Sequence, residues 1–475
     1  MQKTQQRVCV GSYRVWTGLA GVLIVVVAGG FFAGCATTGD LEALTARIER
    51  QVQGFDSAAN NGDAQEEGEA AGEHLVAPAH PVSLLAPSRF VSWAVDRDGA
   101  LWRWGANDQD LGIIPDAKIT DETSPHRVFE GVRWREIAAG PRFFAGITED
   151  GTLHTWGVND RGVLGIADRY TSAWIAGLQS PAPDLRWRSV AAGSESIYAV
   201  SEDGALYAWG NHEDGRLGIG PVEESNLAVV PVETWQDEGF VTVLAVPAPA
   251  RVGSRSDWRS VIAGPDFALA ITESDELYAW GDNSYGQLGL GDRDIRLEPV
   301  RVGAYSDWEV ISAGGRHVLG IRTGGELYAW GDNGMGQLGL GHLDPVSEPV
   351  RVGTRNDWMA AAAYEGFRDA RMGLHSPASA AITVDGRLFT WGSNEAGQLG
   401  DLDSVSPELV PFRSEPAVVE TAGSGFIDVA AGGAHALAIR RNGDVYGWGY
   451  NERRQAGPFP WTGTDSVSLS RLTLE

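Results

Sequence analysis

Two histidines occupy positions where an imidazole could transfer protons. His317 and His435 each follow a Gly-Gly pair, in two related stretches of the chain. Histidine is the side chain whose ordinary pKa best suits proton transfer near neutral pH. One residue type recurring at one register is, however, typical of a structural position rather than of a catalytic one. We therefore predict that both histidines support the fold, and the sequence indicates no catalytic residue.

Two acidic turns could in principle bind a metal. Asp282-Asn283 and Asp332-Asn333 resemble fragments of a calcium loop, but they lack its spaced acidic set and its final Glu. Capping of turns is the favoured interpretation. The chain also has no Gly-Lys-Ser phosphate loop, no Gly-x-Ser-x-Gly elbow and no His-Glu-x-x-His zinc motif. The sequence therefore predicts no metal and no cofactor, although a site assembled from distant loops would show no such motif.

These residues belong to units that recur along the chain. Trp-Gly pairs occur seven times, at intervals of 50 to 71 residues. A unit of this length that cannot bury its own apolar face must stack on copies of itself. The tryptophans of the seven pairs are Trp104, Trp156, Trp209, Trp280, Trp330, Trp391 and Trp448.

Each unit contains four short apolar segments. In the fourth unit they are 259–263, 267–272, 276–280 and 299–302, bounded by Gly, Asp, Asn and Pro. Such segments are typical of strands and turns, and helical periodicity is absent. Seven four-stranded units predict an all-β fold, a seven-bladed β-propeller over residues 80–475.

Tryptophan and glycine have different predicted roles in these units. Each Trp of a Trp-Gly pair is expected to fill the core, burying about 150–250 Å². The following Gly lets the backbone approach closely or take a φ that other residues avoid. A second set of tryptophans precedes the first segment of five units and is also expected to be structural: Trp134, Trp187, Trp258, Trp308 and Trp358.

The two ends of the repeat region suggest how the ring closes. The first unit starts near residue 80 and lacks the Pro-x-Val segment that precedes each later unit. The chain end, 468–474, has the character of that segment and no successor. We therefore expect it to pair beside the N-terminal unit, so that both termini complete one blade and leave no open sheet edge.

The repeated pattern carries a family resemblance. Trp-Gly-x-Asn-x-x-Gly-Gln-Leu-Gly, at the end of an Asp-Gly hairpin, resembles the repeat of the RCC1 family (regulator of chromosome condensation) over residues 80 to 475. The resemblance implies the propeller fold. It also implies chromatin binding or guanine-nucleotide exchange on a small GTPase, as expected of some family members. The exchange residues cannot be placed on this chain position by position.

The first 34 residues have the pattern of a secretory signal. Lys3, Arg7 and Arg14 precede an apolar stretch over 15–33, and Phe-Ala-Gly then leads to Cys35. This ending is similar to the bacterial lipobox, so we expect cleavage before Cys35 and acylation of its thiol. The alternative is an uncleaved signal anchor, because the apolar stretch is just long enough to span a bilayer.

Residues 35–79 are expected to form a flexible acidic tether. The stretch 57–73 is made of Ala, Gly, Asn, Gln and acidic residues, and it cannot bury enough surface to order itself. Apolar residues on one face permit a short helix over 40–53. Together with Cys35, the tether predicts a bacterial lipoprotein held in the cell envelope, on the outer-membrane, periplasmic or surface side.

Charge and insertions bear on the partner. The net charge of −26 disfavours binding to phosphate backbones, so no nucleic-acid partner is expected. Two insertions lengthen the repeat, within 220–250 and 364–377. Insertions in a repeat array map to loops, often on the binding face, with neutral drift as the alternative. The candidate partner-binding residues within them are Trp235, Phe240 and Phe367.

Three functions remain open for such a chain, because fold alone does not decide function. The favoured one is a monomeric, non-enzymatic interaction module that presents the propeller to a protein or glycan partner in the envelope. The second is an exchange-factor-like regulator of a small GTPase. The third is an envelope enzyme with a site at the ring centre, which a buried polar cluster at one mouth of the ring would favour.

Overall fold

The computed structural model describes ten segments of the chain: 82–105, 124–159, 161–166, 171–222, 228–233, 240–366, 377–400, 411–452, 454–457 and 466–472. The predicted signal (1–34), Cys35 and the rest of the tether (35–79) lie outside these residues, as do Trp235 and Phe367. Within the described segments, no helix is both long and apolar enough to cross a membrane.

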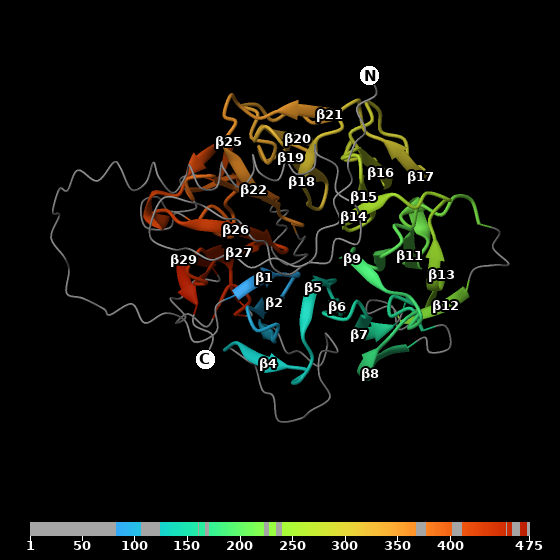
Figure 1. Cartoon of the computed structure of the whole chain (residues 1–475). Helices are drawn as coiled ribbons and strands as arrows, with labels where there is room; N and C mark the ends of the chain where they lie inside the picture. The colour runs from blue at the N-terminus through green and yellow to red at the C-terminus, as the bar shows by residue number, and fades with distance from the viewer. Residues whose placement is uncertain are drawn as a thin grey trace, which may run out of the picture. The chain divides into compact units, whose positions relative to one another are not determined.

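Seven antiparallel sheets follow one another along the chain, and Figure 1 shows them around a ring. We call them blades 1 to 7 in chain order. In each blade the first strand lies toward the ring centre and the fourth lies outside (Figure 1). The predicted all-β, seven-bladed propeller is confirmed.

The strands occupy equivalent places in every blade. The first strands are β1 (Val82–Leu85), β5 (Trp134–Ala139), β9 (Trp187–Ala192), β14 (Trp258–Ala263), β18 (Trp308–Ala313), β22 (Trp358–Ala363) and β26 (Phe426–Ala431). The second strands are β2 (Val91–Asp96), β6 (Phe143–Thr148), β10 (Ser196–Ser201), β15 (Phe267–Thr272), β19 (His317–Arg322), β23 (Ala378–Thr383) and β27 (His435–Arg440). The third strands are β3 (Leu101–Gly105), β7 (Leu153–Asn159), β11 (Leu206–Asn211), β16 (Leu277–Gly281), β20 (Leu327–Gly331), β24 (Leu388–Ser393) and β28 (Val445–Tyr450). The fourth strands are β4 (His126–Val128), β8 (Thr171–Gln179), β13 (Phe240–Arg251), β17 (Arg296–Arg301), β21 (Val346–Arg351), β25 (Phe412–Val418) and β29 (Ser466–Leu472). The remaining elements are strand β12 (Ala228–Glu233) and the 3-10 turns η2 (Glu213–Gly215) and η4 (Glu420–Ala422).

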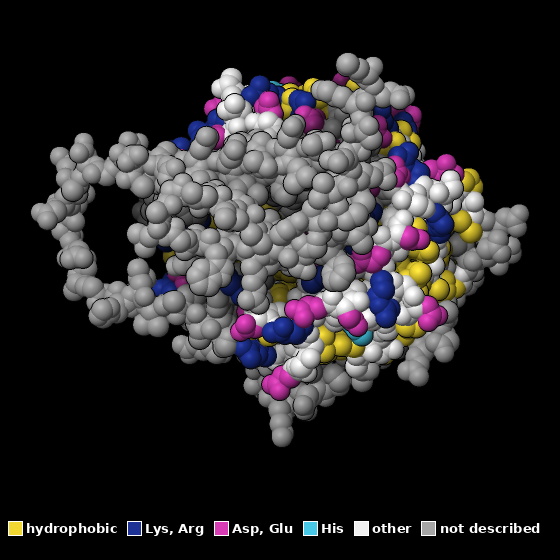
Figure 2. Space-filling model, viewed as in Figure 1, with side chains coloured by type: hydrophobic (Ala, Val, Ile, Leu, Met, Phe, Trp, Pro, Cys, Tyr) yellow, Lys and Arg dark blue, Asp and Glu magenta, His cyan; other side chains and the backbone are white. Residues whose placement is uncertain are grey.

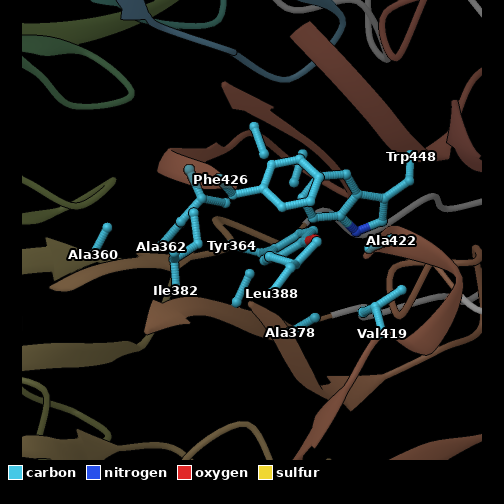
Figure 3. Close-up of a cluster of buried hydrophobic side chains, with 14 residues drawn as sticks. Ala360, Ala362, Tyr364, Ala378, Ile382, Leu388, Val419, Ala422, Phe426 and Trp448 are labelled. Atoms are coloured by element: carbon cyan, nitrogen blue, oxygen red, sulfur yellow. The ribbon is translucent and has the colours of Figure 1, made fainter. Parts of the chain in front are cut away.

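Neighbouring blades bury apolar side chains against each other. Second strands such as β6, β15 and β23 are buried along their whole length, because both of their faces meet protein. Figure 3 shows one cluster, in which Phe426 and Trp448 of blade 7 lie with Tyr364 and Leu388 of blade 6. Complete burial of one large apolar side chain contributes about 1.5–3 kcal/mol. The contacts between blades therefore supply the core of this domain.

In six of the seven Trp-Gly pairs, all but that of Trp156, the described structure shows the Trp linked to the preceding blade around the ring. Its indole Nε1 donates a hydrogen bond to the backbone carbonyl just before the Leu-Gly of that blade, or before Ala456-Gly457 in blade 7. In blade 5, Trp330 Nε1 lies 2.9 Å from the Gln287 carbonyl oxygen. The equivalent bonds in the described segments join Trp209 to Val163, Trp280 to Arg216, Trp391 to Gln337, Trp448 to Gln398 and Trp104 to Gln455. The Trp-Gly and Gln-Leu-Gly parts of the sequence pattern thus meet at the six blade boundaries where the described residues include both parts.

The last strand corrects the expected ring closure. Strand β29 pairs with β28 inside blade 7, and blade 1 is built from β1 to β4 alone. The expectation that the chain end joins the N-terminal unit was therefore wrong. The Pro-x-Val segment is the fourth strand of its own blade, so the first unit needs no copy before it and the last unit ends with its own.

Side chains close the ring in place of a shared strand. Trp104 Nε1 and Ser92 Oγ of blade 1 both donate to the Gln455 carbonyl of blade 7, at 3.0 Å and 2.8 Å. Trp102 and Leu437 belong to one buried cluster that spans the same boundary. Blades 7 and 1 therefore meet through contacts of the kind found at the other boundaries.

The described part of the first insertion forms two strands of a sheet. Strand β12 pairs with β13 from Ala228↔Ala245 to Glu233↔Phe240, and blade 3 becomes a five-stranded sheet. This hairpin extends the outer edge of blade 3. The described strands of the insertion, 228–233 and 240–250, are thus placed at the rim of the ring.

Candidate functional site

One face of the ring collects two sets of loops, and we call it the mouth face. It carries the loops between first and second strands and those that follow the third strands. The two sets are joined by backbone bonds, for example Asp282 N to the Asp266 carbonyl at 3.0 Å. The hairpin turns between second and third strands lie on the opposite face, where Trp134 N bonds the Gly99 carbonyl at 2.9 Å.

The two repeated histidines lie buried between blades. His435 Nε2 is 2.9 Å from Ser92 Oγ, and His317 Nε2 is 3.0 Å from Ser379 Oγ. Both serines also donate to a Gln carbonyl that accepts an indole bond. Burial lowers the pKa of His435 to about 3, so its imidazole is neutral at pH 7. These contacts support the structural role predicted for both residues.

The Asp-Asn turns hold the loops of the mouth face in shape. Asn283 Oδ1 accepts a hydrogen bond from Leu288 N at 3.0 Å, and Asn333 Oδ1 accepts one from Leu338 N at 3.0 Å. Asp282 accepts from Ser284 N at 3.1 Å. These are the turn caps that the sequence favoured. Over the described segments, no group of three or more His, Cys, Asp or Glu side chains is arranged to hold a metal ion.

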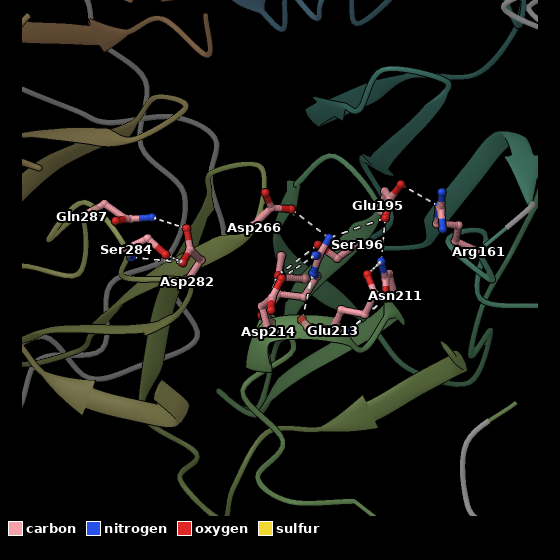
Figure 4. Close-up of polar contacts among 12 residues, drawn as sticks. Arg161, Glu195, Ser196, Asn211, Glu213, Asp214, Asp266, Asp282, Ser284 and Gln287 are labelled. Atoms are coloured by element: carbon pink, nitrogen blue, oxygen red, sulfur yellow. Dashed lines mark hydrogen bonds and ion pairs between the residues drawn. The ribbon is translucent and has the colours of Figure 1, made fainter. Parts of the chain in front are cut away.

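A network of charged side chains crosses the mouth face from blade 2 to blade 4 (Figure 4). Arg161 Nε lies 2.6 Å from Glu195 Oε1. Arg216 Nη1 lies 2.8 Å from Asp266 Oδ1 and 3.6 Å from Glu195 Oε2, while its Nη2 lies 3.5 Å from Asp214 Oδ2. The side chain of Arg216 is 5% exposed, and that of Asp266 is 47% exposed. The network therefore has a buried guanidinium at its base and presents carboxylates to solvent.

The repeat itself shows that these charges are not required by the fold. The residue just before the second strand is Arg142, Glu195, Asp266 and Arg316 in blades 2 to 5, but Phe90, Pro377 and Ala434 in blades 1, 6 and 7. Three blades thus carry no charge at this one position. Because loops on a rigid scaffold often carry binding residues, extra charge at matched positions on one face makes this face a candidate binding surface.

The ring centre holds a pocket of about 140 Å³ where the first strands end. Its wall contains the last residue of every first strand from blade 2 to blade 7, and this residue is alanine each time: Ala139, Ala192, Ala263, Ala313, Ala363 and Ala431. Ser88, Ser194 and Glu365 supply its polar side chains. The sequence signal for this wall was the alanine that ends each Val/Ile/Ala run.

Glu365 of blade 6 reaches across this pocket to blade 3. Ser194 Oγ donates to Glu365 Oε1 at 3.5 Å, although the two residues belong to opposite sides of the ring. Burial raises the pKa of Glu365 to about 7; the positive charge of Arg89 opposes the shift, and the negative charge of Asp266 adds to it. A carboxylate that titrates near neutral pH therefore stands at the ring centre.

Two more carboxyls face the interior from first strands. Glu136 Oε1 accepts from Val190 N at 2.8 Å and from Ser189 Oγ at 3.1 Å, and burial raises its pKa to about 7. Asp428 Oδ1 accepts from Val429 N at 2.9 Å, and burial raises its pKa to about 6. Both shifts come mainly from desolvation, which disfavours the charged form.

The predicted partner-binding residues do not coincide with this site. Trp235 and Phe367 lie outside the described residues, and Phe240 is placed only as the first residue of β13 at the rim of blade 3. Sequence reasoning missed Glu195, Asp266 and Glu365. A comparison of the position before the second strand across units would have singled out the first two.

The surface seen in Figure 2 carries both signs of charge. On the part of this face that is coloured by residue type, acidic and basic side chains are interspersed rather than gathered into a field of one sign. Mixed charge of this kind favours a specific protein contact more than a polyanion.

Comparison with known proteins matches an RCC1-like domain over residues 17–367 and regulator of chromosome condensation (RCC1) repeats over residues 385–439 and 426–455. The chain is similar to the ultraviolet-B receptor UVR8 of Arabidopsis thaliana, 29% identical over 388 residues that cover 80% of this chain and 77% of the relative. It is also similar to the guanine nucleotide exchange factor SRM1 of Saccharomyces cerevisiae, 29% identical over 211 residues, with coverage of 44% and 42%. Among solved structures, Prp20p from Saccharomyces cerevisiae, studied for its binding to Gsp1p and histones, is alike in fold with a TM-score of 0.61. It is 22% identical, and the match covers 83% of this chain and 88% of that chain.

Proposed function

Because the chain belongs to the RCC1-like family of β-propeller proteins, we propose that it is a protein-interaction module, without chemistry of its own, that takes its partner on the mouth face. One observation carries this proposal. Blades 2 to 5 place charge at a position where blades 1, 6 and 7 have Phe90, Pro377 and Ala434. A rigid ring that presents charges beyond its own structural needs is suited to recognise a complementary surface.

The chemistry of the network favours binding over catalysis. The carboxylates of Glu195 and Asp266 are each engaged by an arginine in an ion pair. Proton transfer needs a group poised between two states within reach of a substrate. The polar cluster at the mouth would suit an envelope enzyme, but its ion pairs are the arrangement of a docking surface.

The partner surface is tested by removing charge from the mouth face. We expect the double variant Glu195→Ala and Asp266→Ala to lower photo-crosslinking from position 214 to the partner in intact cells by about tenfold, equivalent to about 1.4 kcal/mol. Alanine is the residue that blade 7 carries at this position, as Ala434, so the loop can form without the charge. Crosslink yield is measured by blotting and the adduct identified by mass spectrometry.

Two controls make this result specific. Glu130→Lys changes charge on the opposite face at an exposed residue and should leave the yield unchanged. Since the double variant leaves the buried Arg216 with fewer partners, Glu213→Lys serves as a second variant that alters only an exposed side chain beside the crosslinking position. Equal yields from wild type, the double variant and Glu213→Lys would reject the mouth face as the partner surface.

The second candidate is an exchange-factor-like regulator. It is supported by the similarity to SRM1, whose name describes guanine-nucleotide exchange, over 44% of this chain. The same crosslinking experiment separates the candidates. A small GTPase as the adduct, together with faster release of mant-GDP from it, would favour exchange activity, whereas an envelope protein or glycan would favour the interaction module. The acidic chain, with a net charge of −26, argues against a nucleic-acid partner.

We further propose that the module is a monomer held in the cell envelope by lipid on Cys35. The support is the basic, apolar and small-residue pattern of residues 1–35. Two signals, a diacylglyceryl and an acyl chain, would anchor it firmly. We expect wild type to incorporate a palmitate analogue and to sediment with membranes, and Cys35→Ala to do neither. Cys9→Ala should behave as wild type, and an unlabelled wild-type protein would reject the anchor.

A further inference from the structure

The central pocket combines a ring of small side chains with one charged end. Six alanines and Pro87, one residue from each blade, line it together with glycines, serines and two further prolines. Among the described residues that line it, Glu365 is the only one with an ionisable side chain. Its volume of about 140 Å³ is close to that of the roughly 150 Å³ cavity that accepts benzene in an engineered protein. A guest of five or six heavy atoms therefore fits.

Glu365 has unused capacity to accept hydrogen bonds. A carboxylate has about four lone-pair sites. Within the described part of the chain, the side chain of Glu365 takes a single hydrogen bond, a long one of 3.5 Å from Ser194 Oγ. A donor that enters the pocket would find the second carboxylate oxygen and the lone pairs of the serine hydroxyl.

We propose that the central pocket binds an alkyl ammonium, a primary amine on an unbranched aliphatic chain such as a lysine side chain. The methylenes pack against the ring of alanine methyls, and the ammonium donates to Glu365 and to Ser194 Oγ. This inference rests on the proposed function where the guest is a lysine of the docked partner, since the pocket opens on the mouth face.

The charges around Glu365 favour a cationic guest. Arg89 and Asp266 are the charged groups that act on it, and Asp266 is itself paired with Arg216 at 2.8 Å. Among the described residues that line the pocket, an ionised Glu365 is the one charged side chain, and a single ammonium that enters the pocket pairs with it.

Alternative guests match the pocket less well. A guanidinium prefers two parallel bonds to a carboxylate, which the hydroxyl of Ser194 obstructs at one oxygen. A divalent cation needs several oxygen ligands, and the pocket offers one carboxylate. A neutral alkyl chain of the same length would fill the wall but leave Glu365 without a donor.

The proposal is tested with n-butylammonium on the purified propeller-containing chain. By titration calorimetry at pH 8 we expect a Kd of about 1–10 mM, the range open to a five-atom ligand. Glu365→Gln should weaken binding at least tenfold, and 1-butanol, of the same length but neutral, should not bind. At pH 5.5 the wild type should also bind at least tenfold more weakly, because Glu365, with a pKa of about 7, is then protonated while the amine stays charged.

Matched variants keep the test falsifiable. Glu130→Gln makes the same chemical change on the opposite face and should keep wild-type affinity. Thermal melting of Glu365→Gln verifies folding, and Glu365→Asp, which keeps the charge, should retain part of the binding. Equal affinity in wild type and Glu365→Gln, or equal binding of 1-butanol, would overturn the proposal.

The two sources of the ammonium are separated by crosslinking in cells. If Glu365→Gln also lowers partner capture from position 214, the guest is a side chain of the partner. If capture is unchanged while n-butylammonium no longer binds, the guest is a free amine. A third result separates the pocket from the proposed function. If n-butylammonium binds the wild type but the Glu195→Ala and Asp266→Ala double variant captures the partner as well as wild type does, the pocket proposal holds and only the proposed function is rejected.

Discussion

Trp330→Phe is expected to lower the free energy of unfolding by about 3 kcal/mol, whereas Trp308→Phe in the same blade should change it by less than about 1 kcal/mol. Both indoles are buried, with relative exposures of 0% and 1%. Trp330 Nε1 donates to the Gln287 carbonyl, and phenylalanine would leave that carbonyl buried without a partner. Trp308 Nε1 has no hydrogen-bond partner in the described structure, so its replacement removes an unsatisfied donor.

Blade 7 already contains the second substitution. Phe426 begins its first strand where five other blades have tryptophan, and it is fully buried. Unfolding in urea, followed by far-UV circular dichroism, measures the pair of variants under identical conditions. Similar losses of unfolding free energy in Trp330→Phe and Trp308→Phe would contradict this expectation. They would show that the volume of the indole, rather than its hydrogen bond to the preceding blade, accounts for the stability that Trp330 contributes.

Gly331→Ala is expected to destabilise the protein by about 3 kcal/mol or more. Gly331 has a φ of +106°, which L-residues avoid. A Cβ at this position would lie 2.4 Å from the Arg316 carbonyl oxygen and 2.8 Å from the His317 Cα. Both are backbone atoms of the neighbouring strand, so relief requires separating two strands of the sheet.

Gly334→Ala provides the matched control three residues later. A Cβ on Gly334 would meet only Asp332 Oδ1, at 3.7 Å. The change should be neutral or should stabilise the protein by up to about 1 kcal/mol, because alanine lowers the conformational entropy of the unfolded chain. Melting temperatures and urea midpoints of the two variants are compared. A stable, well-expressed Gly331→Ala protein would contradict the argument that close strand approach fixes the Gly of each Trp-Gly pair.

The fold could be predicted because each repeat shows its strands as short apolar segments bounded by turn residues. Phe267–Thr272 and Leu277–Gly281 follow the segments that the fourth unit predicted. Pairing at the chain ends was not predictable in the same way. Residues 466–472 have the pattern of a fourth strand, and a pattern does not say which sheet a terminal strand joins. The sheet that this terminal strand joins depends on which strand comes first in a unit. Because β1 supplies the first strand of blade 1, blade 1 needs no strand from the chain end.

The candidate site was missed for the opposite reason. Motif searching finds what the units share, whereas Glu195 and Asp266 lie where the units differ. Glu365 lies at the start of the second insertion, and its importance comes from a contact with Ser194, 171 residues earlier. No spacing rule relates two residues on opposite sides of a ring. The aromatic residues of the insertions were predicted to bind a partner because of their residue type. Phe240, however, lies in a hairpin at the edge of blade 3, which only the pairing of strands could reveal.

The bond from Trp104 to the Gln455 carbonyl spans 351 positions of the chain. A polypeptide that leaves the ribosome or a translocation channel N-terminus first delivers the indole long before its acceptor. Until residue 455 arrives, the outer surface of the first blade has no seventh blade to cover Trp102 and Trp104. The first blade therefore keeps apolar surface exposed until the seventh blade has been made. The time needed to synthesise or export the six blades that follow it sets how long this surface is prone to aggregation and needs a chaperone.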